Sequence, residues 1–224
     1  MLDYLMLEIN VIRRLVYARY ERQLNRTYQT RLAKEGYNPR GVFWRSKSSQ
    51  VARFDSLLSL VHKLKPKITV SIADIGCGYG AMFEFISSSP KFNYFDYHGV
   101  DINSAMIEAC QKKYPSQTGL FSIGNKPQKE VDFCLFSGTF NLTHSNDSAL
   151  WTDYVFSCLK KCMTRTRHGL VLNLLCTPKT KIQKQIFYIN RAAFISQAEA
   201  YFGSVFAQKT NGVIDDVSFV ITRS

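Results

Sequence analysis

The fold is decided by the stretch 72–80, which reads Ile-Ala-Asp-Ile-Gly-Cys-Gly-Tyr-Gly. Residues 68–75 form an almost uninterrupted apolar and β-branched run, which is typical of a parallel strand covered on both faces. The glycines that follow permit a sharp turn and let a ligand approach the backbone closely. Because residues 81–88 favour a helix, the stretch predicts a strand–turn–helix unit with a ligand at the turn. The glycines alone also fit a dinucleotide-binding fingerprint.

Two carboxylates distinguish between the possible ligands. Asp74 stands two residues before Gly76, at the carboxyl end of the predicted strand, where it would repel a pyrophosphate but can accept hydrogen bonds from an ammonium group. Asp101 ends the next predicted strand, residues 97–102, where its two oxygens can bind both hydroxyls of a ribose. An amino acid joined to a ribose describes S-adenosylmethionine, which the sequence therefore predicts as the cofactor.

Strands alternate with helices along the rest of the chain. The last two strands flank Asn211-Gly212, a pair that readily adopts positive φ, so they predict an antiparallel hairpin. The whole pattern predicts an α/β fold, a Rossmann-like doubly wound seven-stranded sheet with an antiparallel C-terminal hairpin. The predicted strands are 68–75, 97–102, 118–123, 131–137, 169–176, 205–209 and 217–222, and the predicted helices of this part are 81–88, 104–113, 148–163 and 191–201. A basic loop is expected at 177–184.

The N-terminal part has a different character. Apolar residues recur every three or four positions from Leu5 to Leu32, which predicts one long helix over residues 4–34, and a second helix is expected over residues 48–65. We therefore divide the chain into an N-terminal helical cap, residues 1–65, and a cofactor-binding domain, residues 66–224. Because the apolar stripe is continuous, it needs a surface to cover, and the helix is expected to close over the cofactor cleft.

The motifs resemble those of a known family. Asp-Ile-Gly-Cys-Gly-Tyr-Gly (74–80) with Gly-Val-Asp-Ile (99–102) is similar to the first two motifs of the class I S-adenosylmethionine-dependent methyltransferases. Three further stretches, 41–44, 50–54 and 137–142, resemble a bacterial subgroup of small, mostly uncharacterised methyltransferases. The resemblance extends over residues 36–224.

This resemblance implies roles for individual residues. Asp74 and the glycines after it would hold the methionine moiety, Asp101 the ribose, and Ile102 would pack on the adenine. The family commonly has an acidic residue after the third strand to accept the adenine amine, and here Asn125 offers a neutral acceptor oxygen. Asn125 is equally acceptable as a turn residue. The predicted cofactor-binding residues are Asp74, Gly76, Cys77, Gly78, Asp101, Ile102, Asn125, Ser137 and Gly138.

The acceptor is expected where the fourth strand ends. Methyl transfer needs alignment and exclusion of water, with a base only when the nucleophile starts protonated. Phe140 and Asn141 are expected to face the acceptor, together with Trp44 and Arg45. Asn141 and His144 are the candidate catalytic residues, although Asn141 could instead cap a helix and His144 could be a solvent-facing loop histidine. We expect no metal, because the sequence lacks a clustered set of ligands.

The charge of the chain indicates which classes of acceptor or partner it can bind. The chain of 224 residues carries a net charge of +12, and its first 65 residues hold 13 Lys and Arg against five Asp and Glu. The positive field favours a small anionic acceptor, methylated at an O or N atom. An alternative is RNA, bound by Arg19, Arg22 and Arg26 with interleaved tyrosines such as Tyr20 and Tyr28. A second alternative is a non-catalytic cofactor-binding fold that serves as a binding subunit.

Cysteine usage and hydropathy bear on the compartment. The six cysteines form no C-x-x-C pair and lie in apolar stretches, which is typical of free thiols in a reducing environment. Charged residues interrupt the N-terminal apolar positions before a signal peptide or a membrane span of about 18 residues can form. We therefore predict a cytoplasmic protein without a membrane span. The sequence leaves the oligomeric state open.

Overall fold

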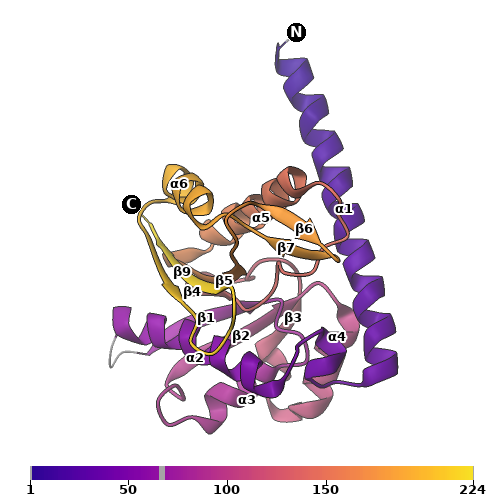
Figure 1. The fold of residues 1–224 in the computed structure, drawn as a ribbon. Coiled ribbons are helices and arrows are strands. Elements are labelled where there is room, and N and C mark those ends of the chain that lie inside the picture. The colour runs from indigo at the N-terminus through magenta and orange to yellow at the C-terminus, as the bar shows by residue number, and fades with distance from the viewer. Residues whose placement is uncertain (1, 66–68, 224) are drawn as a thin grey trace.

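A computed structural model describes residues 2–65 and 69–223, with side chains described from Val11 onward. The chain contains nine strands within this range: β1 (Val70–Ile75), β2 (Phe95–Asp101), β3 (Phe121–Ile123), β4 (Val131–Phe136), β5 (Thr166–Leu175), β6 (Lys181–Gln183), β7 (Ile186–Tyr188), β8 (Val205–Lys209) and β9 (Asp216–Thr222). Seven of them form one sheet in the order β3-β2-β1-β4-β5-β9-β8 (Figure 1). The first five are parallel, and β9 runs antiparallel to both β5 and β8.

The helices lie where the sequence pattern places them. They are α1 (Leu2–Glu35), α2 (Lys47–Leu64), α3 (Ala81–Ser88), α4 (Ser104–Lys113), α5 (Ser148–Met163) and α6 (Arg191–Phe202). The predicted doubly wound seven-stranded fold with its C-terminal hairpin and N-terminal helical cap is confirmed. The expected start of the first strand, and the expected boundary between residues 65 and 66, fall on or beside residues 66–68, which lie outside the described residues.

Two details differ from the sequence expectation. The third strand was expected from residue 118, but Pro115 starts a short 3-10 helix, Pro115–Leu120, that leaves only three residues for β3. The expected basic loop, 177–184, contains β6, which forms a small hairpin with β7, and the turn residues Lys184 and Gln185 both have positive φ. Lys-Gln carries no recognised turn signal, because positive φ at a hairpin turn is usually supplied by Asn or Gly.

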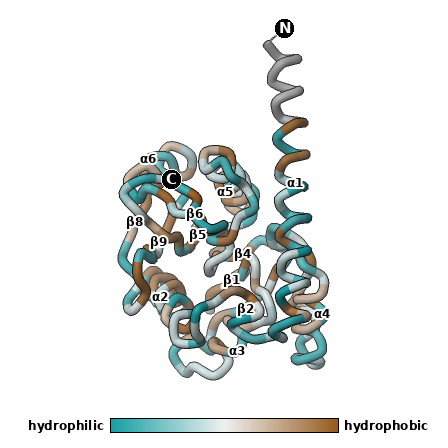
Figure 2. Tube along the Cα trace, turned by 45° about the vertical axis from the view of Figure 1, so that its right-hand side comes forward, coloured by the Kyte–Doolittle hydropathy of each residue, from teal (hydrophilic) through white to brown (hydrophobic). Residues whose placement is uncertain are grey.

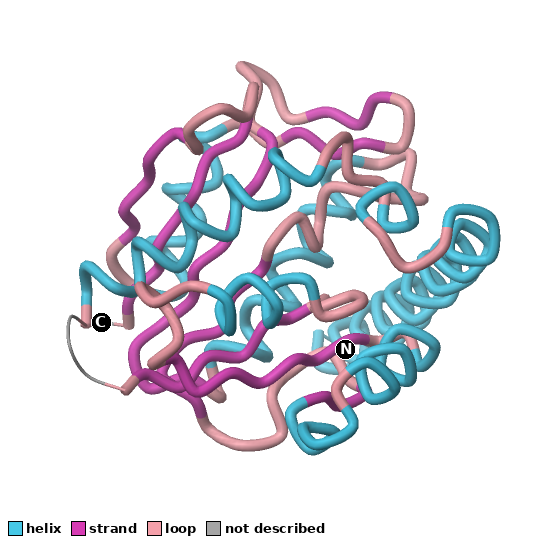
Figure 3. Tube along the Cα trace, turned by 90° about the horizontal axis from the view of Figure 1, so that it is seen from below, coloured by secondary structure: helices cyan, strands magenta, loops and turns pink. Residues whose placement is uncertain are grey.

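Helices cover both faces of the sheet (Figure 3). One face packs against α1, α5 and α6, and the other against α2, α3 and α4. Side chains on β5 alternate between the two layers: Leu170 and Leu172 belong to the first core, whereas Val171 belongs to the second. Both cores are closed by large apolar side chains, so the central strands are buried on both faces as their apolar runs predicted.

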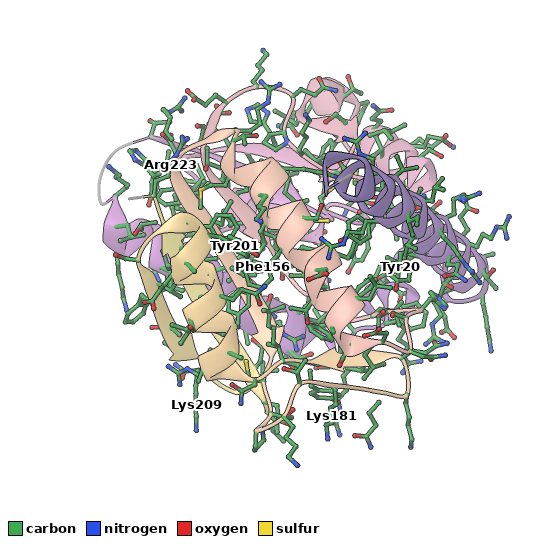
Figure 4. The ribbon with its side chains drawn as sticks, turned by 90° about the horizontal axis from the view of Figure 1, so that it is seen from above. Tyr20, Phe156, Lys181, Tyr201, Lys209 and Arg223 are labelled. Carbon is green, nitrogen blue, oxygen red and sulfur yellow. The ribbon has the colours of Figure 1, made fainter. Side chains whose placement is uncertain are left out.

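Helix α1 lies along the body with its C-terminal half and projects beyond it with its N-terminal half (Figure 1). Tyr20 is buried and meets Trp151 of α5 edge-on, with ring centroids 5.2 Å apart, and its hydroxyl donates to Ser145 Oγ at 2.9 Å. Seen from above, α5 lies between α1 and α6, with Phe156 and Tyr201 filling the space between α5 and α6 (Figure 4). The packed half of α1 is therefore part of the fold.

The projecting half of α1 carries apolar as well as polar residues (Figure 2). Ile12 and Leu15 are 60% and 64% exposed, respectively. Across residues 2–65 and 69–223, no helix is both long enough and apolar enough to cross a membrane.

Candidate active site

A cavity of about 550 Å³ opens at the carboxyl ends of β1, β2 and β4 and is closed over by residues of α1 and α2. Its size lies in the range typical of small-molecule sites. It lies where the strand order reverses between β1 and β4, the position at which open α/β sheets bind their ligands. Every residue predicted to bind the cofactor lines this cavity, and so do the predicted acceptor residues Trp44, Arg45, Phe140 and Asn141.

The glycine-rich turn is held against the end of β4. Gly76 has φ +79°, and a Cβ placed on it would lie 2.8 Å from Thr139 Cγ2. Thr139 in turn donates its hydroxyl to the carbonyl oxygen of Ile75 at 2.7 Å. Only glycine combines this backbone conformation with such a close approach. The turn and the end of β4 therefore form one continuous wall of the cavity.

Asp74 lies at the end of β1 and is 2% exposed. Its Oδ2 accepts a hydrogen bond from the hydroxyl of Tyr97 at 2.9 Å. Burial raises the pKa of Asp74 to about 7, with a further rise from nearby Asp101, and the bond from Tyr97 opposes this shift only in part. A cation beside Asp74 would favour the ionised carboxylate, so the residue suits an ammonium ligand.

Asp101 accepts hydrogen bonds from the backbone of the glycine-rich turn and can still accept hydrogen bonds from a ligand. Its Oδ2 accepts from the backbone N–H of Gly78 and its Oδ1 from that of Asn103, each at 2.9 Å. Burial raises the pKa of Asp101, and backbone hydrogen bonds, including these two, lower it in opposition. Because each carboxylate oxygen can accept a second hydrogen bond, Asp101 can still bind two hydroxyls of a ribose.

Helix α1 contributes two polar residues near the predicted adenine end. Asn125 donates from Nδ2 to Glu21 Oε1 at 3.2 Å, which leaves Asn125 Oδ1 as an acceptor. Asn25 donates from Nδ2 to the carbonyl oxygen of Ile102 at 3.3 Å, and its Oδ1 is buried without a partner among the described residues. Sequence reasoning missed both Glu21 and Asn25. Their four-residue spacing on the cap helix is the signal that could have placed them on one face.

The acceptor end lies after β4. Gly138 has φ +69°, and a Cβ placed on it would lie 3.0 Å from Trp44 Cζ2, so the indole packs directly on this turn. The Oγ of Ser137 and the Oδ1 of Asn141 are buried without partners in the part of the chain that the structure describes. Buried polar atoms are normally paired. These two atoms are therefore suited to bind groups of a ligand.

Arg53 also lines the acceptor end, although it is not among the site residues predicted from the sequence. It is 8% exposed, and its Nε donates to Asp216 Oδ2 at 2.6 Å. Asp216 belongs to β9, far away in the sequence. No sequence signal pairs these two residues, because their contact exists only once α2 has packed on the sheet.

The two candidate catalytic residues differ in position. Asn141 lines the cavity, and it does not cap α5, because Asp147 accepts from the first N–H groups of that helix. His144 does not line the cavity: its Nε2 lies 2.7 Å from Thr27 Oγ1 of α1. His144 is neither at the acceptor end nor a free loop side chain, but ties the segment after β4 to the cap helix. No group of three or more His, Cys, Asp or Glu suited to a metal occurs among the described residues.

Comparisons with known proteins bear on the family and the fold of the chain. Residues 73–169 match the family model described as a methyltransferase domain. The magnesium protoporphyrin IX methyltransferase of Synechocystis, solved with bound S-adenosylmethionine, is structurally similar, with a TM-score of 0.55 and 13% identity over 79% of this chain and 81% of that one. Residues 73–169 therefore form a methyltransferase domain, and the fold is that of the class I S-adenosylmethionine-dependent methyltransferases.

Two further proteins are similar to this methyltransferase. A provisionally named methyltransferase of Mycobacterium tuberculosis is 25% identical over 126 residues, which is 55% of this chain and 75% of the relative. An S-adenosylmethionine-dependent methyltransferase of Leishmania major has a TM-score of 0.59 and 10% identity, over 88% of this chain and 82% of that one. These structural similarities show the shared fold. The cofactor of this methyltransferase is S-adenosylmethionine.

Proposed function

We propose that this methyltransferase transfers the methyl group of S-adenosylmethionine to an O or N atom of a small anionic acceptor. The observation that carries the proposal is one continuous cavity, which runs from the predicted cofactor residues Asp74 and Asp101 to an acceptor end lined by Arg53 and Asn141. Residues of α1 and α2 close over it, so it suits a small molecule. The basic cap, with Arg45 exposed beside the cavity, favours an anion.

Different residues of the chain bind the cofactor, orient the acceptor and exclude water. When bound, the cofactor supplies an electrophilic methyl group on a sulfonium. Asp74 is suited to hold its ammonium group and Asp101 its ribose, while Asn141 Oδ1 can accept a hydrogen from the acceptor and orient its nucleophilic atom. Phe140, which is buried, helps to exclude water. Because His144 lies outside the cavity, we propose that the acceptor reacts as an anion or as a neutral amine, which needs no base.

The packing of α1 supports a cap over the cofactor site. Tyr17 meets Tyr154 of α5 at a tilt and Tyr20 meets it edge-on, and Tyr28 meets Phe43 edge-on. These tyrosines are therefore engaged within the protein, whereas Arg19, Arg22 and Arg26 are exposed. Sequence-tolerant RNA binding usually combines basic side chains with free aromatic faces. In the part of α1 whose side chains are described, the tyrosines near these arginines are thus occupied by packing, which disfavours the RNA alternative.

Binding and transfer are tested in turn. In calorimetric titrations, S-adenosylmethionine and S-adenosylhomocysteine should bind and NAD should not. With an isotope-labelled methyl group, label should then enter small anionic acceptors and not RNA. Transfer to RNA alone would contradict the proposal. Cofactor binding without transfer to any acceptor would favour the non-catalytic alternative.

A further inference from the structure

Arg53 is a buried cation whose hydrogen-bonding capacity is largely unused. Its Nε donates to Asp216, and neither Nη1 nor Nη2 forms a hydrogen bond with any residue in the described ranges 2–65 and 69–223. A guanidinium has five N–H donors, so four remain. Because Arg53 lines the cavity, these donors are available to a molecule inside it.

The guanidinium of Arg53 is held in one orientation. Its Cζ lies 4.5 Å from the ring centroid of Trp44, which covers one face. Asp216, which fixes Nε, also accepts from Asn173 Nδ2 at 2.8 Å, and Asn173 Oδ1 accepts from the backbone N–H of Gly138 at 2.9 Å. Since Trp44 packs on Gly138, these contacts form a closed ring that fixes Arg53 relative to the turn after β4.

The cavity that Arg53 lines also has many apolar side chains in its walls. Phe54, Phe140, Leu175 and Val213 line the same cavity and come from four different segments of the chain. A ligand at this end would therefore bury an apolar body. The unused N–H groups of a guanidinium match the geometry of a carboxylate or a phosphate, which they bind with two parallel hydrogen bonds.

We propose that Arg53 anchors a planar oxyanion of the methyl acceptor, and that the acceptor is an amphipathic molecule with one carboxylate-like group on an apolar body. The inference rests on the proposed function and specifies its substrate class. Arg53 is a positioning and specificity residue: it fixes the acceptor beside the turn after β4, so that the atom to be methylated lies near Ser137 and Asn141.

The test measures binding of acceptor-like probes to the full chain saturated with S-adenosylhomocysteine. The probes are benzoate, 1-naphthoate and octanoate, each compared with its neutral amide by calorimetry. We expect at least one carboxylate to bind roughly tenfold to a hundredfold more tightly than its amide, because charged hydrogen bonds are lost in the amide. Arg53→Gln should abolish this difference and leave the affinity for S-adenosylhomocysteine unchanged.

Two further variants keep the test interpretable. Arg53→Gln leaves the buried Asp216 without a cationic partner. The double variant Arg53→Gln with Asp216→Asn removes both charges and should give the same loss if the single variant does not fold. Arg22→Gln is the matched control, because Arg22 is exposed on α1 and does not line the cavity. It should retain most of the preference for the carboxylate.

The outcomes separate the anchor from the proposed function. Equal affinities for acids and amides, no binding of any carboxylate, or a preference that survives removal of Arg53 would each overturn the anchor. Failure of S-adenosylhomocysteine to bind would instead contradict the proposed function. The probes are also titrated in the absence of S-adenosylhomocysteine. This titration measures carboxylate binding at Arg53 even if S-adenosylhomocysteine does not bind.

Discussion

At the scale of single residues, burial raises the pKa of Asp74, and this affects both stability and ligand binding. In the free protein its pKa is about 7, so the carboxyl is largely protonated below neutral pH. Its raised pKa, compared with a value near 4 in the unfolded chain, also means that Asp74 lowers the free energy of unfolding as pH rises from about 4 to about 7. Ligand binding should show the opposite trend, because an ammonium group pairs with the ionised carboxylate.

We predict that the affinity for S-adenosylhomocysteine rises about fivefold between pH 6 and pH 7.5. The rise reflects ionisation of Asp74, while the amino group of the ligand remains mostly protonated over this range. Calorimetry at several pH values measures the affinity. Asp74→Asn, which cannot ionise, should bind more weakly and lose this rise. An unchanged pH dependence in the variant would contradict the assignment of Asp74 to the ammonium group.

Gly138 gives a second prediction at this scale. Gly138→Ala places a Cβ at positive φ and 3.0 Å from Trp44, so it should lower the free energy of unfolding by about 1–2 kcal/mol and weaken the carboxylate preference of the acceptor site. Urea unfolding measures the stability. Gly119→Ala is the control: a Cβ there meets nothing within 4 Å, and we expect little change. Equal effects of both substitutions would contradict the close packing of Trp44 on Gly138.

At the scale of elements, α1 is both part of the core and a wall of the cavity. Tyr20 anchors it to α5, and Asn25, one turn further on, reaches the carbonyl of Ile102. The helix therefore cannot loosen without opening the predicted adenine end. This couples the stability of the cap to cofactor binding.

We predict that Tyr20→Ala lowers the free energy of unfolding by about 3 kcal/mol, as large-to-small changes in a core do. The affinity for S-adenosylhomocysteine should fall with it, and amide hydrogen exchange in α1 should accelerate more than in the central strands. Arg26→Ala, on the exposed side of the same helix, should change none of these quantities. An unaltered cofactor affinity in Tyr20→Ala would show that α1 is not a wall of the cofactor site.

At the scale of the whole molecule, the cofactor cavity joins both halves of the sheet to the cap. A ligand that binds only this folded arrangement stabilises all of it at once. We predict that S-adenosylhomocysteine at about 100 times its dissociation constant adds about 2.7 kcal/mol, which corresponds to a rise in Tm of roughly 5–10 °C for a chain of this size. Scanning calorimetry measures the rise. NAD at the same concentration should give no shift, and an equal shift would contradict the choice of cofactor.

Much of this molecule was predictable from local sequence. The run 68–75, the glycines after it and Asp101 all lie in strand–turn–helix units whose ligand-facing ends follow from the topology rule for parallel sheets. The predicted helices 81–88, 104–113 and 148–163 match α3, α4 and α5, because their apolar spacing and N-terminal Gly, Asn and Asp mark them locally. The β6–β7 hairpin was missed because its turn uses Lys184 and Gln185 at positive φ, which tertiary contacts impose.

The sequence by itself determined the doubly wound sheet, the cofactor turn and the two carboxylates, because each depends on residues close together in the chain or on the period of a pattern. Only the tertiary structure decided what faces the acceptor. Three contacts join segments up to 163 residues apart. Arg53 pairs with Asp216, Trp44 packs on Gly138, and His144 contacts Thr27 of α1 instead of the cavity. Such contacts leave no periodic signal, because they depend on how α1 and α2 pack on the finished sheet.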